Sequence, residues 1–145
     1  MPELIVLVGV PGSGKSTFYE SKFIKTHERI SLDLISGRKR EDKLLDKYTN
    51  EKLNIVIDNT NPSAIDRMKY IRIGKHNNYK VICYFLDSTP EESKKRNSTR
   101  SGKKRVPDIA IDVIQSRLEK PSYEEGIDEI WNVKISNNKF IINRK

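Results

Sequence analysis

The chain has 145 residues, which is enough for one domain, because a domain of about 150 residues buries roughly 68–70% of its unfolded surface. Its composition, 35% hydrophobic and 33% charged, excludes a fully disordered chain and is typical of a soluble globular one. The formal net charge of +8 favours polyanionic partners such as nucleic acids, although a charged solubilising surface would carry the same excess.

Short apolar runs alternate with amphipathic stretches along the chain. The apolar runs predict strands because they are short and are followed by glycine, proline or aspartate. The helices are indicated by capping residues, early prolines and apolar residues at helical spacing. In chain order we expect strand 4–8, helix 14–25, strand 28–32, strand 53–57, a helix opened by Asn61-Pro62, strand 80–86, a helix starting at Thr89-Pro90-Glu91-Glu92, helix 107–118 and strand 127–135.

Two of the predicted helices carry apolar residues at helical spacing, the pattern of an amphipathic helix. In the helix after Asn61-Pro62 these residues are Ile65, Met68 and Ile71, and in helix 107–118 they are Ile109, Val113, Ile114 and Leu118. Alternating strands and helices predict a parallel sheet with helices on both faces. We expect five strands in a single domain over residues 1–145, and the segment 136–140 has the residues to turn the last strand into a hairpin.

Cys83 is the single cysteine of the chain, so no internal disulfide can form. It lies in the apolar run VICYFL, where we expect a buried and inert thiol. The chain shows no signal peptide, and its apolar start is too short to span a membrane. These features predict a cytoplasmic, intracellular protein without membrane partners.

The segment Gly9–Ser16 fits the phosphate-binding pattern G-x-x-x-x-G-K-[ST] in full. Glycines let backbone N–H groups turn toward an anion, the lysine reaches the β- and γ-phosphates, and the serine hydroxyl binds Mg²⁺. An apolar strand precedes the pattern and an amphipathic helix follows it, which is the context that a phosphate loop requires. We therefore predict a nucleotide site formed by Gly9, Pro11, Gly12, Ser13, Gly14, Lys15, Ser16 and Thr17.

Two aspartates follow predicted strands, and strand ends at the carboxyl edge of an α/β sheet face the ligand crevice. Asp58 follows the third strand and is expected to help hold Mg²⁺ together with Ser16. Asp33 follows the second strand and could accept a proton from an attacking hydroxyl, which would make the protein a kinase. For each aspartate the alternative is a capping or turn role.

The densest basic cluster follows the fourth predicted strand and includes Arg96, Arg100 and Arg105. Many phosphoryl-transfer enzymes place arginines against the transferring group, where they stabilise its negative charge. Most basic runs are solvated helix faces, and that is the alternative here. The position of this basic cluster after the fourth strand favours a small lid. The expected fold is an α/β P-loop NTPase or kinase fold with a mostly parallel five-stranded sheet.

Four segments together resemble the kinase module of the P-loop polynucleotide 5′-hydroxyl kinases, both the phage type and the kinase domain of the animal polynucleotide kinase/phosphatase. These segments are GVPGSGKST, VIDNTNP, KKRNSTR and RVPDIAIDV. The resemblance implies that the loop holds ATP with Mg²⁺ and that the acceptor is the 5′-hydroxyl of a DNA or RNA end during nucleic acid repair. It further implies Asp33 as the base, Arg96 and Arg100 as lid arginines, Val106 near the adenine, and Asn59 and Thr60 near the acceptor.

The sequence departs from the phage-type pattern after the base. That pattern, D-x-x-R, ends in an arginine that clamps the acceptor phosphate, whereas here Ser36 occupies the corresponding position. Arg38 and Arg40 follow soon after, and Arg38 is our candidate for the missing acceptor contact. Two other classes stay open: a P-loop kinase of a small metabolite or aminoacylated carrier, and a nucleotide-binding hydrolase or regulatory protein. The sequence leaves the oligomeric state undetermined.

Overall fold

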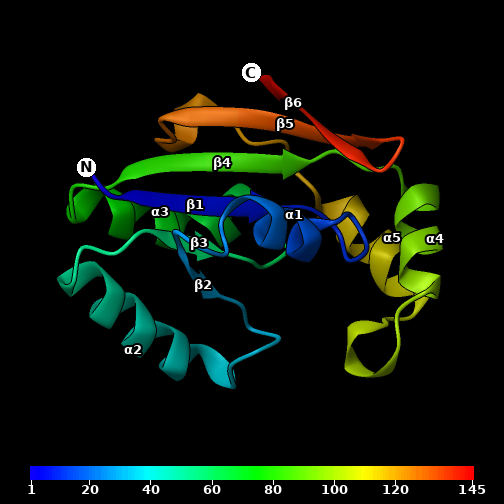
Figure 1. Cartoon of the computed structure of the whole chain (residues 1–145), viewed down its shortest axis with the longest axis horizontal. Coiled ribbons are helices and arrows are strands. Elements are labelled where there is room, and N and C mark those ends of the chain that lie inside the picture. Colours follow the sequence, from blue (N-terminus) through cyan, green and yellow to red (C-terminus); the bar gives the residue numbers. More distant parts are fainter.

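The computed structural model describes residues 1–145 apart from the side chain of Lys103, and its centre is a six-stranded sheet (Figure 1). The strand order is β2-β3-β1-β4-β5-β6, with all neighbours parallel except the antiparallel pair β5 and β6. The mostly parallel α/β arrangement is therefore confirmed. The strands are β1 Glu3–Val8, β2 Glu28–Ile30, β3 Ile55–Ile57, β4 Lys80–Leu86, β5 Glu129–Ser136 and β6 Lys139–Arg144.

The expected count of five strands was wrong by one, because a hairpin adds β6 to the edge of the sheet. The hairpin turn that the sequence indicated is present. Asn137 and Asn138 both have positive φ, 50° and 61°, which is the backbone conformation of a two-residue turn that follows the twist of the strands.

Five α-helices connect the strands, with two short 3₁₀ turns between them. The helix at Pro90 begins where it was predicted, because Thr89 and Glu92 form a reciprocal capping box. The preceding helix begins at Ala64 instead of Asn61-Pro62, because Ser63 and Asp66 cap it there. The helices are α1 Lys15–Lys22, α2 Gly37–Asn50, α3 Ala64–His76, α4 Pro90–Ser98 and α5 Asp108–Arg117, and the 3₁₀ turns are η1 Gly102–Lys104 and η2 Tyr123–Glu125.

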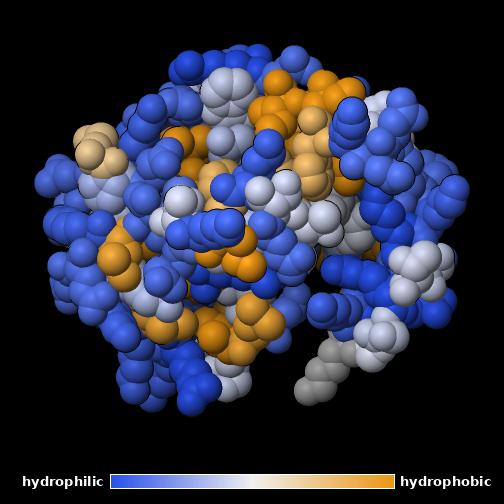
Figure 2. Space-filling model, in the orientation of Figure 1, coloured by the Kyte–Doolittle hydropathy of each residue, from blue (hydrophilic) through white to orange (hydrophobic). Residues whose placement is uncertain are grey.

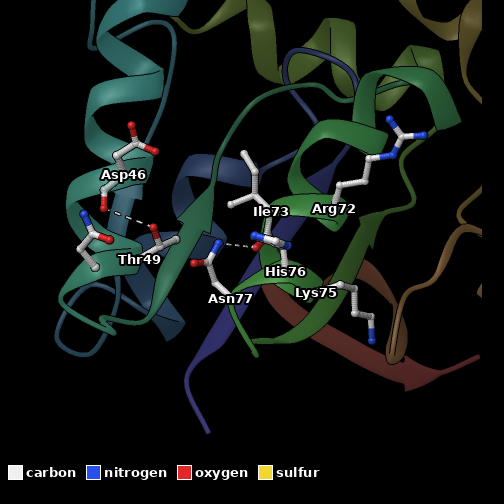
Figure 3. A pocket seen from close by; sticks show the side chains of 8 residues that line it. Asp46, Thr49, Arg72, Ile73, Lys75, His76 and Asn77 are labelled. Atoms are coloured by element: carbon white, nitrogen blue, oxygen red, sulfur yellow. Dashed lines mark hydrogen bonds between the residues drawn. The ribbon is translucent and has the colours of Figure 1, made fainter.

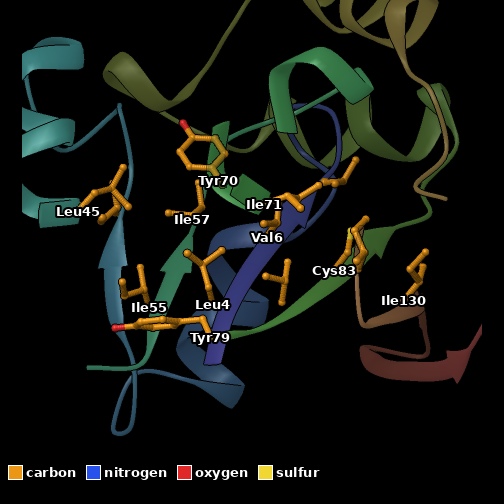
Figure 4. Close-up of a cluster of buried hydrophobic side chains, with 14 of the residues drawn as sticks. Leu4, Val6, Leu45, Ile55, Ile57, Tyr70, Ile71, Tyr79, Cys83 and Ile130 are labelled. Atoms are coloured by element: carbon orange, nitrogen blue, oxygen red, sulfur yellow. The ribbon is translucent and has the colours of Figure 1, made fainter. Parts of the chain in front are cut away.

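The sheet separates two buried clusters, so helices cover both of its faces as expected. Residues of α2 and α3, including Leu45, Tyr70 and Ile71, pack against one face (Figure 4). On the other face α1 contributes Phe18, whose ring lies 5.1 Å from that of Phe140 in β6. The β5–β6 hairpin therefore extends the core beside α1.

Helical spacing of apolar residues identified the buried faces of α3 and α5 only in part, because Ile71 is buried while other residues of the pattern lie in solvent. Ile65 is 77% exposed and Ile109 is 69% exposed, and Met68 and Val113 are also exposed. In α3 the buried face instead includes Arg67, which is fully buried because Glu125 accepts two hydrogen bonds from its guanidinium at 2.8 and 3.0 Å. A buried charge with a bidentate partner is compatible with a core position, and this pairing joins residues distant in the sequence.

Most of the visible surface is hydrophilic, in keeping with the composition (Figure 2). Among the described residues, no helix combines the length and the apolar character that crossing a bilayer requires.

We expect Cys83 to react with thiol reagents only after unfolding. The side chain is fully buried, and this burial raises the pKa of the thiol to about 12. At pH 8 only about one thiol in 10⁴ would be the reactive thiolate, even if the reagent could reach it. Titration with Ellman's reagent should show no fast equivalent in buffer and one in 6 M guanidinium chloride. Rapid labelling of the native protein would contradict this expectation.

Candidate active site

A cleft of about 570 Å³ lies at the carboxyl edge of the sheet, where β1 is flanked by β3 on one side and β4 on the other. This is the position at which open α/β sheets bind ligands, because the connections leave the central strand in opposite directions. In Figure 1 the arrow of β4 points toward α4, on the side where α5 also lies. The cleft is lined by Pro11, Gly12, Gly14, Lys15, Ser16, Thr17, Leu32, Asp33, Asp58, Asn59, Thr60, Arg96, Thr99, Arg100, Lys104, Val106 and Ile114.

The loop after β1 depends on its glycines. Gly12 and Gly14 have φ values of 84° and 100°, a left-handed conformation that other residues rarely adopt. A Cβ atom on Gly12 would lie 2.3 Å from the backbone oxygen of Ser93 in α4, so this glycine also lets the loop approach α4 closely. Gly9 and Ser13 were predicted for the site but do not line the cleft, and the side chain of Ser13 is buried beside Gly9.

Lys15 lies at the start of α1 with its ammonium turned over the loop. Its Nζ donates to the carbonyl oxygens of Gly9 at 2.9 Å and Val10 at 3.1 Å. Burial lowers the pKa of Lys15 to about 8; the carboxylates of Asp58 and Asp33 oppose this shift, and Arg100 adds to it. Both aspartates and Arg100 line the same cleft as Lys15.

Asp58 follows β3 directly and is 4% exposed. Arg29, which was not predicted as a site residue from the sequence, joins it to Ser16. Arg29 of β2 donates from Nε to Asp58 Oδ2 at 2.8 Å and from Nη2 to Ser16 Oγ at 2.9 Å. The available signal was charge in β2, where Glu28 and Arg29 are two of the three residues, because strands of parallel sheets are usually apolar.

Asp33 lines the cleft but does not end a strand as predicted. β2 stops at Ile30, and the chain then turns because the carbonyl of Ser31 accepts hydrogen bonds from the amides of Leu34 and Ile35. Asp33 is exposed, and among the described residues its carboxylate accepts no hydrogen bond and forms no ion pair. This carboxylate is therefore available to a group that enters the cleft.

The lid arginines both line the cleft but differ in their contacts. Arg96 donates to the carbonyl of Gly12 at 3.3 Å and to the hydroxyl of Ser88 at 3.1 Å, which ties α4 to the phosphate loop. Arg100 follows α4 and forms no ion pair with any residue that the structure describes. The buried side chain of Asn97 closes the lid loop through two hydrogen bonds with the backbone of Val106, at 2.6 and 3.0 Å. Val106 is thereby held at the cleft.

Arg38 does not line the cleft, but hydrogen bonds among residues of α2 and α3 connect it to Asn59, which does. Its Nη1 donates to Glu41 and to the hydroxyl of Tyr70, to which the amide of Asn59 also donates at 3.3 Å. Glu41 is fully buried; burial alone would raise its pKa, but hydrogen bonds from Lys69 and Tyr70 hold the pKa below its usual value. Neither α2 nor this carboxylate was predicted from the sequence.

A second, more open cavity of about 840 Å³ lies between α2 and α3, away from the phosphate loop (Figure 3). Its lining includes Asp46, Thr49, Arg72 and His76, and it contains none of the residues predicted for the site. It is thus separate from the cleft that gathers the candidate catalytic groups.

The residues of the cleft fit a nucleotide phosphate group and a divalent cation. The N-terminus of α1 and the left-handed glycines offer amide donors and a positive dipole end to an anion. The oxygens of Ser16 and Asp58 are close enough to share one cationic group, Arg29. Two such oxygen ligands suit Mg²⁺, which takes few protein ligands and completes its shell with phosphates and water.

Comparison with known proteins adds the family context. The sequence profile of a family described as AAA domain matches residues 38–121, a segment that starts after the glycine loop. A bifunctional polynucleotide phosphatase/kinase of Schizosaccharomyces pombe is 33% identical over 135 residues, and a putative enzyme of the same name from Acanthamoeba polyphaga mimivirus is 34% identical over 138 residues. Each alignment covers 90% of this chain but only 33% of the relative, so the chain spans about a third of their length.

Solved structures support the fold. A gluconokinase from Sinorhizobium meliloti superposes with a TM-score of 0.66 at 19% identity, over 94% of this chain and 84% of that one. At this identity the likeness concerns the fold alone, and it confirms the prediction of a P-loop kinase fold.

Proposed function

This chain belongs to the AAA domain family, and on that premise we propose that it transfers the γ-phosphoryl group of ATP to the 5′-hydroxyl of a DNA or RNA end. The proposal is supported by the kinase part of the name that both curated relatives carry. The net charge of +8 also favours it, because a polyanionic acceptor gains affinity from lysine and arginine side chains.

The observation that carries the proposal is the carboxylate of Asp33, which lines the same cleft as Lys15 and has no partner among the described residues. A carboxylate beside the phosphate loop can accept the proton of a hydroxyl that enters the cleft, as phosphoryl transfer to a hydroxyl requires. In the proposed reaction Asp33 accepts the proton of the 5′-hydroxyl, and the oxygen of that hydroxyl forms a bond to the γ-phosphorus. The bond from that phosphorus to the β–γ bridging oxygen breaks, and ADP leaves.

The remaining groups bind and neutralise the reactants. Lys15 and the amides of the phosphate loop hold the β- and γ-phosphates, and Ser16 and Asp58 would hold Mg²⁺, which neutralises phosphate charge when bound. Val106 is assigned to the adenine side of the cleft. Arg38, Asn59 and Thr60 are assigned to the acceptor, since Asn59 and Thr60 line the cleft and Asn59 shares the Tyr70 hydroxyl with Arg38.

We expect Arg100→Ala to lower kcat by about 10²-fold with a small change in the KM for the acceptor, because a cation that meets developing charge acts mainly in the transition state. Arg96→Ala should also lower kcat and in addition weaken nucleotide binding, since Arg96 donates to the carbonyl of Gly12. Arg105→Ala is the matched control, because Arg105 is exposed and does not line the cleft. Normal turnover of both Arg96→Ala and Arg100→Ala would show that these arginines are ordinary surface charges without a role in the reaction.

The proposal is tested with γ-labelled ATP, Mg²⁺ and oligonucleotides of DNA and RNA that carry either a 5′-hydroxyl or a 5′-phosphate. Label should appear on the 5′-hydroxyl forms only, and binding of these oligonucleotides should weaken steeply with added salt. Label on no oligonucleotide, with ATP consumed only after a metabolite pool is added, would instead indicate a small-molecule kinase. Steady ATP hydrolysis without any acceptor would indicate a hydrolase.

A small acceptor is the second candidate, and one observation favours it. Ser36, in the position where the phage-type pattern has its acceptor arginine, is the N-cap residue of α2 and is exposed. If Arg38 does not replace that arginine, the acceptor contact is reduced, as a smaller substrate would tolerate. Arg38→Ala separates the two candidates, because it should raise the KM for an oligonucleotide acceptor and leave the KM for ATP unchanged.

A further inference from the structure

We propose that Arg29 competes with the divalent cation for Ser16 and Asp58, and so sets the concentration of Mg²⁺ at which the protein binds its nucleotide tightly. The inference rests on the proposed binding of a metal–nucleotide complex and is independent of the acceptor.

The geometry of the guanidinium carries this inference. One nitrogen, Nη2, lies 2.6 Å from Asp58 Oδ2 and 2.9 Å from Ser16 Oγ, so it bridges the two oxygens that are assigned to the metal. A residue that merely supports a metal ligand would contact it from the side away from the metal. Here a single positively charged nitrogen takes the position between both ligands.

The side chain is held in this position from two directions. Arg29 is anchored in β2 beside β3, and its guanidinium carbon lies 5.1 Å from the centre of the Tyr19 ring in α1. The Arg29 side chain is 21% exposed and that of Asp58 is 3% exposed, so water screens their interaction only partly. Moving the Arg29 guanidinium away from the buried carboxylate of Asp58 is therefore unfavourable unless another cation replaces it.

Arg29 and a metal ion compete for Ser16 and Asp58 because both are cations that need the same oxygens. A metal ion bound to Ser16 Oγ would lie next to Nη2 of Arg29. Two neighbouring cations repel strongly in a partly dehydrated site. Metal binding therefore requires the guanidinium to give up at least its contact with Ser16. The contacts of Arg29 with Ser16 and Asp58 oppose this change, which raises the Mg²⁺ concentration needed for half-maximal binding.

The test measures ADP affinity by isothermal titration calorimetry at a series of free Mg²⁺ concentrations, without any oligonucleotide. Arg29→Gln removes the charge and keeps a hydrogen-bond donor for Asp58, and Arg29→Met removes both. Arg144→Met is the matched control, because the Arg144 guanidinium also lies over an aromatic ring, that of Trp131, at 5.6 Å, but in β6.

We expect the Mg²⁺ concentration for half-maximal gain in ADP affinity to fall about tenfold in both Arg29 variants and to stay unchanged in the control. Electron paramagnetic resonance of Mn²⁺ bound in the presence of ADP should show the same tightening. An unchanged or higher Mg²⁺ requirement in Arg29→Gln would overturn the inference and assign Arg29 to the support of Asp58. ADP binding that is independent of Mg²⁺ in the wild-type protein would overturn the metal assignment, and this inference with it.

Discussion

Replacing Lys15 by alanine is expected to lower phosphoryl transfer by about 10³-fold or more, because the ammonium offsets charge on the β- and γ-phosphates as the bond between them breaks. Among the described residues, the Lys15 ammonium donates to two loop carbonyls alone, so the fold should tolerate its removal. Burial of this ammonium also disfavours its charged form, as its lowered pKa shows, and alanine relieves that cost. The variant should therefore melt at or slightly above the temperature of the parent while losing turnover.

Initial rates at saturating ATP, together with thermal unfolding, measure both effects. Lys22→Ala is the matched control, because Lys22 lies in the same helix and is exposed. Turnover of Lys15→Ala within a few-fold of the parent would remove the phosphate loop from the mechanism. A large fall in its melting temperature would show that the loop needs the lysine for its own structure.

Asp33→Asn is expected to lower 5′-hydroxyl phosphorylation by about 10²–10⁴-fold, the contribution typical of a general base. Asparagine preserves the shape of the side chain and any turn contact while removing the proton acceptor. Because Asp33 is exposed and its carboxylate is unpartnered among the described residues, binding of ATP with Mg²⁺ and the melting temperature should both match the parent.

The comparison requires single-turnover rates, with nucleotide affinity measured on the same samples. Asp87→Asn is the matched control: it removes one negative charge just after β4, at the same edge of the sheet, but Asp87 does not line the cleft. Transfer at the parental rate by Asp33→Asn, with intact nucleotide binding, would exclude Asp33 as the base.

The phosphate loop and the parallel sheet were predictable because local patterns determine them. β1 and β4 are apolar runs, and the glycines of the loop meet a backbone requirement that few other residues can satisfy. The lid helix was predictable for the same reason, since Thr89 and Glu92 cap it reciprocally.

Contacts between distant segments were not predictable from local patterns. α2 has few apolar residues, and it packs through Leu45 and through Glu41, whose partners Lys69 and Tyr70 lie on α3. The bridge from Arg29 to Ser16 and Asp58 likewise joins three elements that only the folded sheet brings together. The exposed Ile65 and Ile109 show the converse, because helical spacing alone does not identify the face that packs on the sheet.

The central claim is that the γ-phosphoryl group passes from the cleft to a 5′-hydroxyl, and its most direct test is the stoichiometry of the reaction. ADP, inorganic phosphate and oligonucleotide 5′-phosphate are quantified together in one reaction with a 5′-hydroxyl oligonucleotide. We predict one 5′-phosphate end for each ADP formed, and no inorganic phosphate above the control without protein. ADP that appears with an equal amount of inorganic phosphate, while the oligonucleotide ends stay unmodified, would contradict the account.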